Sequence, residues 1–147
     1  MTQGGSWLGV LTLLVAVLVA YIAFQQWLVS RAKLKLDLFE RRLKIYEATQ
    51  QYILQSIAAG PPEQSDFLSD IARASFLFGS DIEHYMGEVL DARAKLRAIV
   101  QHAAGNGGVV RSEDVDLNFQ LNTWLGEEWG DKCRKRFAPY LDFSSWR

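Results

Sequence analysis

Cysteine and histidine are scarce in this sequence, which has one cysteine and two histidines among 147 residues. Cys133 has no partner for an intramolecular disulfide, and no CxxC motif or Cys/His set of the kind that binds zinc is present. Because Cys133 falls on the apolar line of its predicted helix, we expect a buried, inert thiol. Its cationic neighbours would lower its pKa if it were exposed, so a reactive thiol is the alternative.

Charged side chains are absent before Arg31 and then arrive abruptly. Six cations follow within a short stretch, against only Asp37 and Glu40; they are Arg31, Lys33, Lys35, Arg41, Arg42 and Lys44. Over the whole chain the net charge is −1, which argues neither for nor against a nucleic-acid partner. Because no basic stripe surrounds the second cluster, Lys132 to Arg136, we expect no nucleic-acid binding.

The segment from Trp7 to Val29 is predicted to be a transmembrane helix. Its residues are apolar or nearly so through Phe24, and at about 1.5 Å per residue their length approaches the roughly 30 Å hydrocarbon core of a bilayer. Aromatic residues flank the run, as at membrane interfaces. A cleaved signal peptide is disfavoured because no basic segment precedes the run and the run is too long.

The charge asymmetry predicts the orientation of the helix. By the positive-inside rule, residues 1–6 form a short tail outside and the C-terminal domain lies in the cytoplasm. Cations next to a membrane also gain roughly 1 kcal/mol each near anionic lipid, so the cluster from Arg31 to Lys44 is a candidate headgroup site. The alternative is that these cations only fix the topology.

Small residues recur at steps of three and four along the predicted span. This places them on one narrow stripe of the helix, where another helix backbone could approach closely. The other interpretation is that Gly and Ala are common in any span. The stripe comprises Gly5, Gly9, Thr12, Ala16, Ala20 and Ala23.

No glycine or proline interrupts the chain between Ser30 and Gly60, so the span is predicted to continue as one long helix. Apolar residues keep helical register in two neighbouring lines, with Gln50 as a polar exception. A face this broad favours an intramolecular bundle over a homodimeric coiled coil. The lines are Val29, Ala32, Leu36, Phe39, Leu43, Tyr46, Ile53 and Ile57, and then Leu34, Leu38, Ile45 and Tyr52.

Glycine, proline and capping residues predict helices at about 30–59, 63–78, 81–104 and 113–138, with a tail at 139–147. Gly60, Pro61 and Pro62 end the first helix. Ser80 and Glu83 form a predicted capping box, and Ser112 is a second predicted N-cap. Pro139 is expected to break the last helix, and Gly126 and Gly130 to weaken it.

The last helix is predicted to bury one apolar line, comprising Val115, Phe119, Leu125, Trp129, Cys133 and Phe137. Leu117, Leu121 and Trp124 flank this line. No segment alternates apolar and polar residues as a strand does. The sequence therefore predicts an all-α protein, in which a transmembrane helix continues into a cytoplasmic domain resembling a four-helix bundle.

Three stretches carry a resemblance: YIAFQQWLVSRAKLKLDLFERRLKIYEA from Tyr21, FLFGSDIEHY from Phe76 and RFAPYLDFS from Arg136. The chain resembles a widespread group of small, uncharacterised bacterial single-pass membrane proteins along nearly its whole length. The join between the span and KLDLFERR is the most specific part. The resemblance implies a bacterial origin and a place in the inner membrane, and it implies no activity.

Few residues suggest chemistry. Asp81, His84 and Glu88 share a helix face, but no other predicted helix supplies a matching ligand set, so we expect no metal. GNGG at Gly105 is followed by two valines, which excludes a phosphate loop. We expect no catalytic residue and no cofactor, and we expect that the protein is not an enzyme.

The resulting hypothesis is a single-pass inner-membrane protein whose helical domain binds a protein, as a scaffold, adaptor or accessory subunit. The partner would be another protein or a second copy, held through the span, the domain or both. The alternative is a membrane-tethered sensor or effector whose domain binds a small ligand or acts on the membrane.

Overall fold

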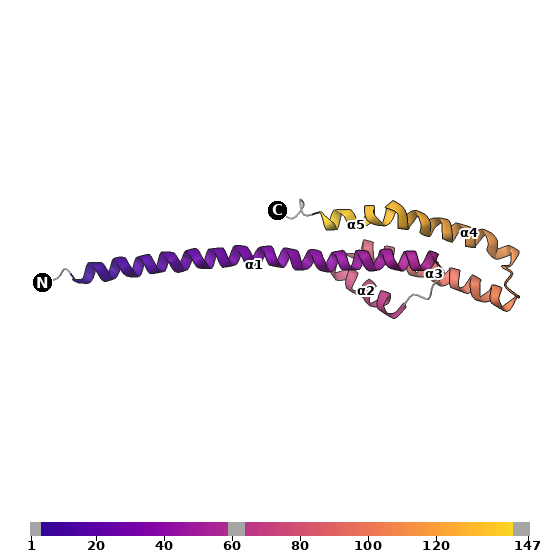
Figure 1. Cartoon of the computed structure of the whole chain (residues 1–147), viewed down its shortest axis with the longest axis horizontal. Coiled ribbons are helices and arrows are strands. Elements are labelled where there is room, and N and C mark those ends of the chain that lie inside the picture. The colour runs from indigo at the N-terminus through magenta and orange to yellow at the C-terminus, as the bar shows by residue number, and fades with distance from the viewer. Residues whose placement is uncertain (1–3, 59–63, 143–147) are drawn as a thin grey trace. The chain divides into compact units, whose positions relative to one another are not determined.

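The computed structural model describes residues 4–58 and 64–142, all of whose regular elements are helical (Figure 1). They are α1 (Gly4–Ile57), α2 (Gln64–Leu77), α3 (Ser80–Gly105), α4 (Ser112–Glu127), the π-helical turn η1 (Glu128–Lys132) and α5 (Cys133–Leu141). The predicted all-α class, with a long apolar helix followed by helices that pack together, is confirmed. Most predicted helix ends lie within two residues of those observed. The predicted stop at Gly60, Pro61 and Pro62 lies outside the described residues.

The chain divides into two compact units, Met1–Phe39 and Glu40–Arg147, and α1 contributes to both. In the first unit, every described side chain from Trp7 to Leu34 is exposed. The most apolar window of α1 has a mean hydropathy of 2.5. This helix is therefore a candidate membrane-spanning helix, a property that membrane anchors share with signal sequences.

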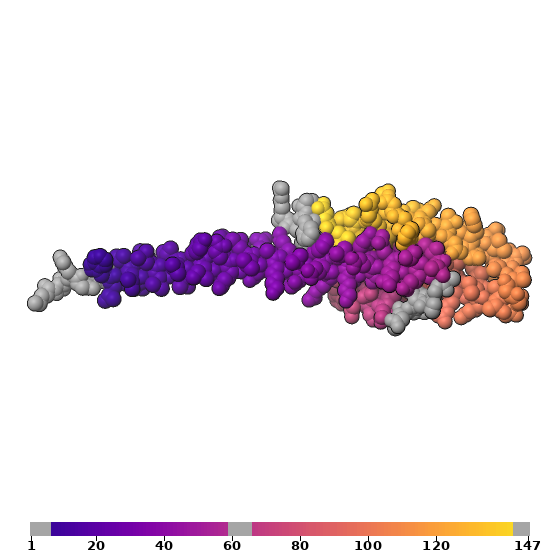
Figure 2. All heavy atoms as spheres, in the orientation of Figure 1, coloured from indigo at the N-terminus to yellow at the C-terminus, as the bar shows by residue number. Residues whose placement is uncertain are grey.

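The second unit has a hydrophobic core to which every one of its helices contributes. Figure 2 shows α5, in yellow, against this part of α1, in purple. Tyr46 of α1 contacts Phe137 of α5, with ring centroids 5.4 Å apart, and Tyr52 of α1 contacts Phe67 of α2. The buried core comprises Ile45, Tyr52, Ile53, Phe67, Ala74, Phe78, Ile82, Tyr85, Met86, Val89, Ala92, Leu96, Leu125, Cys133 and Phe137.

The face that α1 buries differs from the predicted lines. Thr49 and Ser56 are buried with Ile45, Tyr52 and Ile53, whereas Ile57 and Leu36 are exposed and Phe39 is half-buried. The two hydroxyls donate to carbonyl oxygens one turn earlier, Ile45 O at 2.8 Å and Tyr52 O at 2.7 Å. Because each hydroxyl has a hydrogen-bond partner within its own helix, these polar residues can occupy core positions. A pattern of apolar residues does not reveal such positions.

Both predicted N-caps are wrong. The N-cap of α3 is Gly79, whose φ of 100° favours glycine, and the N-cap of α4 is Arg111; neither helix has a side-chain hydrogen bond at its N-cap. Since Gly79 itself turns the chain, Ser80 already lies in the first turn. At its other end α3 is closed by backbone bonds, because the N–H groups of Asn106 and Gly108 both donate to Ala103 O.

The last predicted helix is interrupted and then extends past Pro139. Gly130 lies inside η1, so the expected irregularity near Gly126 and Gly130 is present. The predicted break at Pro139 is wrong, because α5 includes this proline and ends at Leu141. Pro139 comes late in a short helix, where it removes only one hydrogen bond.

Candidate functional site

The π-helical turn changes which residues α4 and α5 bury. The buried line runs from Leu125 of α4 to Glu128 of η1, and the extra residue of η1 then places Cys133, five positions later, and Phe137 in the core. From Leu125 onward the predicted line assumed steps of four, and it is therefore wrong at Trp129, which is 46% exposed. It is also wrong at Val115 and Phe119, which are exposed.

Glu128 is the most unusual residue of the core, because its carboxylate is only 1% exposed. Its Oε1 lies 3.4 Å from Nη2 of Arg136, whose guanidinium also covers the Tyr85 ring at 4.5 Å. Glu128 Oε2 and the Tyr85 hydroxyl are buried without a hydrogen-bond partner among the described residues. Such unpaired groups cost stability, and π-helical turns occur often at functional sites.

Cys133 faces the same cluster and is fully buried. Burial raises the pKa of its thiol to about 11; Glu128 adds to this effect, whereas the neighbouring Tyr85 hydroxyl and the Arg136 cation oppose it. Burial also raises the pKa of Tyr85 far above its ordinary value, with Cys133 and Glu128 contributing. The expected burial of the thiol is confirmed. Its lack of reactivity stays a prediction, supported by the raised pKa, because the thiolate is the nucleophile and the metal ligand.

The part-buried Arg42 side chain makes hydrogen bonds within the second unit. Its Nε donates to Leu77 O and its Nη1 to Tyr140 O, both at 3.0 Å. These carbonyls belong to the last turns of α2 and α5, where a cation also complements the helix dipole. In the same way, Arg93 Nη1 donates to a carbonyl oxygen in the last turn of α1, Ser56 O at 2.8 Å. Sequence analysis grouped Arg42 with the candidate lipid-binding cations, because a sequence alone does not show contacts between distant residues.

The other cations of that cluster divide between the two units. Arg31 lies over the Trp27 ring at 5.4 Å, on the next turn of α1. Lys33, Arg41 and Lys44 are exposed, and Lys35 is half-buried. Headgroup binding by these residues stays a prediction.

The small-residue stripe is exposed along α1 in the first unit. A Cβ built on Gly9 would meet nothing within 4 Å, and Ala16, Ala20 and Ala23 are exposed. The Thr12 hydroxyl donates to Leu8 O at 2.7 Å and so needs no partner helix. Packing through this stripe also stays a prediction.

The described residues contain no group of three or more His, Cys, Asp or Glu side chains placed to hold a metal ion. Asp81 accepts a hydrogen bond from the Tyr140 hydroxyl at 2.5 Å, which lowers the pKa of Asp81 and raises that of Tyr140. His84 Nε2 lies 3.6 Å from Glu88 Oε1 on the adjacent turn. Asp81 therefore has a structural role, in joining α3 to α5.

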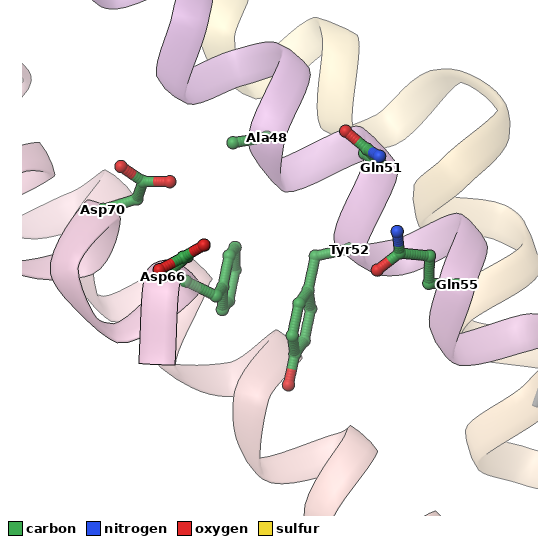
Figure 3. A pocket seen from close by; sticks show the side chains of 7 residues that line it. Ala48, Gln51, Tyr52, Gln55, Asp66 and Asp70 are labelled. Carbon is green, nitrogen blue, oxygen red and sulfur yellow. The ribbon is translucent and has the colours of Figure 1, made fainter. Parts of the chain in front are cut away.

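A pocket of about 300 Å³ opens between α1 and α2 (Figure 3). Asp66 and Asp70 of α2 form one wall, and Gln51 and Gln55 of α1 the other. Between them lie Ala48 and the stacked rings of Tyr52 and Phe67, whose centroids are 3.8 Å apart. The sequence analysis missed this pocket, because its two walls come from different helices.

A second feature is an apolar face on the outside of α4 and η1, which we call the α4 outer face. Val115, Phe119, Gly126 and Gly130 are spaced by four or seven residues and so share one side, and Trp129 borders them. Phe119 is 73% exposed, and a Cβ on Gly126 or Gly130 would meet nothing within 4 Å. The face comprises Val115, Phe119, Gly126, Trp129 and Gly130.

No family model, curated protein or solved structure matches the chain. The resemblance to small bacterial membrane proteins therefore stays a prediction, as do the expected absences of enzymatic activity and of nucleic-acid binding.

Proposed function

We propose that the chain is a single-pass protein of the bacterial inner membrane whose second unit lies in the cytoplasm and binds a protein partner. It would serve as a scaffold, an adaptor or an accessory subunit. The absence of charge before Arg31 and the cations after it support this orientation. A retained anchor is favoured over a signal sequence because α1 runs without a break from the apolar segment to Ile53 in the core.

The α4 outer face is the observation that carries the protein-binding proposal. Exposed aromatics such as Phe119 and Trp129 are typical anchors of interfaces, and burying one gains roughly 1.5–3 kcal/mol. Each glycine in a helix interior costs about 1 kcal/mol relative to alanine. A Cβ on Gly126 or Gly130 would meet no atom of the described residues within 4 Å, so no close contact among them requires a glycine, whereas a docked helix would use the bare backbone.

We assign this face to a helix of another protein, with a second copy as the competing occupant. Two copies anchored in one membrane by the same helix would be related by an axis normal to the membrane. Residues near such an axis face themselves, so Asp116, which borders Phe119 one turn away, would meet a like charge.

The test is site-specific photocrosslinking in membranes of living cells. A photoreactive phenylalanine at position 119 is expected to link to a peptide of a different protein, whereas the same group at Phe76, which is 90% exposed on α2, is not. Gly126→Leu should abolish the link, while Gly87→Leu, at an equally open glycine of α3, should not. Links to a second copy, or equal links from both positions, would refute the assignment.

A second function, a membrane-tethered sensor or effector that binds a small ligand, is favoured by the pocket between α1 and α2. The pocket and the α4 outer face share no residue, so the two functions are tested separately.

A further inference from the structure

The pocket between α1 and α2 presents two polar walls on either side of an apolar floor (Figure 3). Asp66 and Asp70 are one turn apart on α2, and Gln51 and Gln55 are one turn apart on α1. Residues spaced in this way have Cβ atoms about 5–6 Å apart. The pocket therefore offers two polar positions separated by about one helical turn.

The lining favours a cation. It includes two carboxylates and no lysine, arginine or histidine. The Asp70 side chain is only 17% exposed, and the cation beside it, Arg73 at 3.3 Å, has a side chain that is 66% exposed. A largely buried carboxylate with one long, solvent-weakened ion pair would gain from a closer positive charge.

The shape and chemistry of the pocket favour an organic cation over a metal ion. Ca²⁺ takes six to eight oxygen ligands and Mg²⁺ requires nearly ideal octahedral geometry. No third acidic, histidine or cysteine ligand joins the two aspartates in the described part of the chain. The floor of Ala48, Tyr52 and Phe67 is apolar, which suits methylene groups. At about 300 Å³, the cavity is at the lower end of the range for small-molecule sites.

We propose that this pocket binds a short aliphatic diamine. One ammonium group donates to Asp66 and the other to Asp70, and the amide oxygens of Gln51 and Gln55 accept further hydrogen bonds. The methylene chain lies over Ala48 and the edges of the two stacked rings. Charge-assisted bonds at both ends make affinity depend on the presence of two ammonium groups.

The test is isothermal titration of the full chain in detergent micelles with 1,4-diaminobutane. Butylamine, with one ammonium group, and 1,4-butanediol, with none, serve as ligand controls. We expect the diamine to bind at least about tenfold more tightly than butylamine, because its second ammonium group makes a charge-assisted hydrogen bond that butylamine cannot make. The diol should not bind.

Protein variants locate the site. Asp66→Asn and Asp70→Asn should each weaken diamine binding by at least about tenfold. Asp91→Asn, at an exposed ion pair with Lys95 on α3, should leave it unchanged. Ala48→Leu fills the floor without changing charge and should also weaken binding, which covers the case in which an aspartate variant fails to fold.

Three results would overturn the proposal. They are equal affinities for the diamine and butylamine, unchanged binding in Asp66→Asn and Asp70→Asn, and no heat of binding at about 1 mM diamine. Tighter binding of Mg²⁺ than of the diamine would assign the pocket to a metal ion instead. Since crosslinking at Phe119 uses another surface, a negative titration would leave the protein-binding proposal intact.

Discussion

Arg42 Nη1 donates to the backbone carbonyl oxygen of Tyr140 at 3.0 Å, although 98 residues separate them in the sequence. The same guanidinium donates to Leu77 O and lies 5.7 Å from the centre of the Phe78 ring. One side chain of α1 thus holds the C-terminal ends of two other helices.

Arg42→Ala is therefore predicted to destabilise the second unit by about 1.5–3 kcal/mol, the usual contribution of a hydrogen bond to a charged group. Arg42→Lys should recover little, because an ammonium lacks the fork that reaches two carbonyls. Arg41→Ala, at the exposed neighbouring cation, is the matched control and should be neutral. Thermal unfolding of the full chain in detergent measures all three, and equal midpoints for Arg41→Ala and Arg42→Ala would contradict the role.

Tyr85→Phe is predicted to leave stability unchanged or to raise it by up to about 1 kcal/mol, because it removes a buried hydroxyl that lacks a partner. Phe137→Ala, at a fully buried ring of the same cluster, should instead cost about 3–5 kcal/mol. Denaturant unfolding distinguishes the two. A clear loss of stability in Tyr85→Phe would mean that the hydroxyl is hydrogen-bonded after all.

Alkaline pH is predicted to unfold the domain. Burial raises the folded-state pKa of Cys133 from 9.0 to about 11, and it also raises the pKa of Tyr85 above 10.0. The unfolded chain therefore loses these protons first, so this contribution is complete below pH 9.0 and is lost as pH rises through about 11. Cys133→Ala should flatten the fall in melting temperature over this window. An unchanged pH profile in that variant would show that the thiol does not contribute.

How much the sequence predicts depends on whether a feature is local. Gly79, Gly105 and the charge-free segment before Arg31 are local, and they predicted helix order and the candidate span. The π-helical turn is not visible in that way, because its extra residue changes the step between buried positions and places Glu128 instead of Trp129 in the core. Arg42 looked like its neighbour Arg41, since only the fold brings Leu77 and Tyr140 to it.

The small-residue stripe of α1 gives a prediction for the membrane segment. If Ala16 and Ala20 contact another helix, replacing both with Leu should abolish association while preserving insertion, since leucine is more hydrophobic but blocks close approach. Leu14→Ile with Leu18→Ile, away from the stripe, is the matched control. Crosslinking in membranes is the measurement. An unchanged signal in the Ala-to-Leu pair would mean that the helix is only an anchor.

Binding of a cytoplasmic protein requires first that the second unit lie on the cytoplasmic side, and cysteine labelling tests this directly. In a Cys133→Ser chain, Ser112→Cys places a single thiol at an exposed position of the second unit, and Thr2→Cys places one before the span. In cells with a permeabilised outer membrane, an impermeant maleimide is predicted to label position 2 at once and position 112 only after lysis. Labelling of position 112 in the unlysed cells, with position 2 protected, would contradict the proposed orientation and the cytoplasmic partner with it.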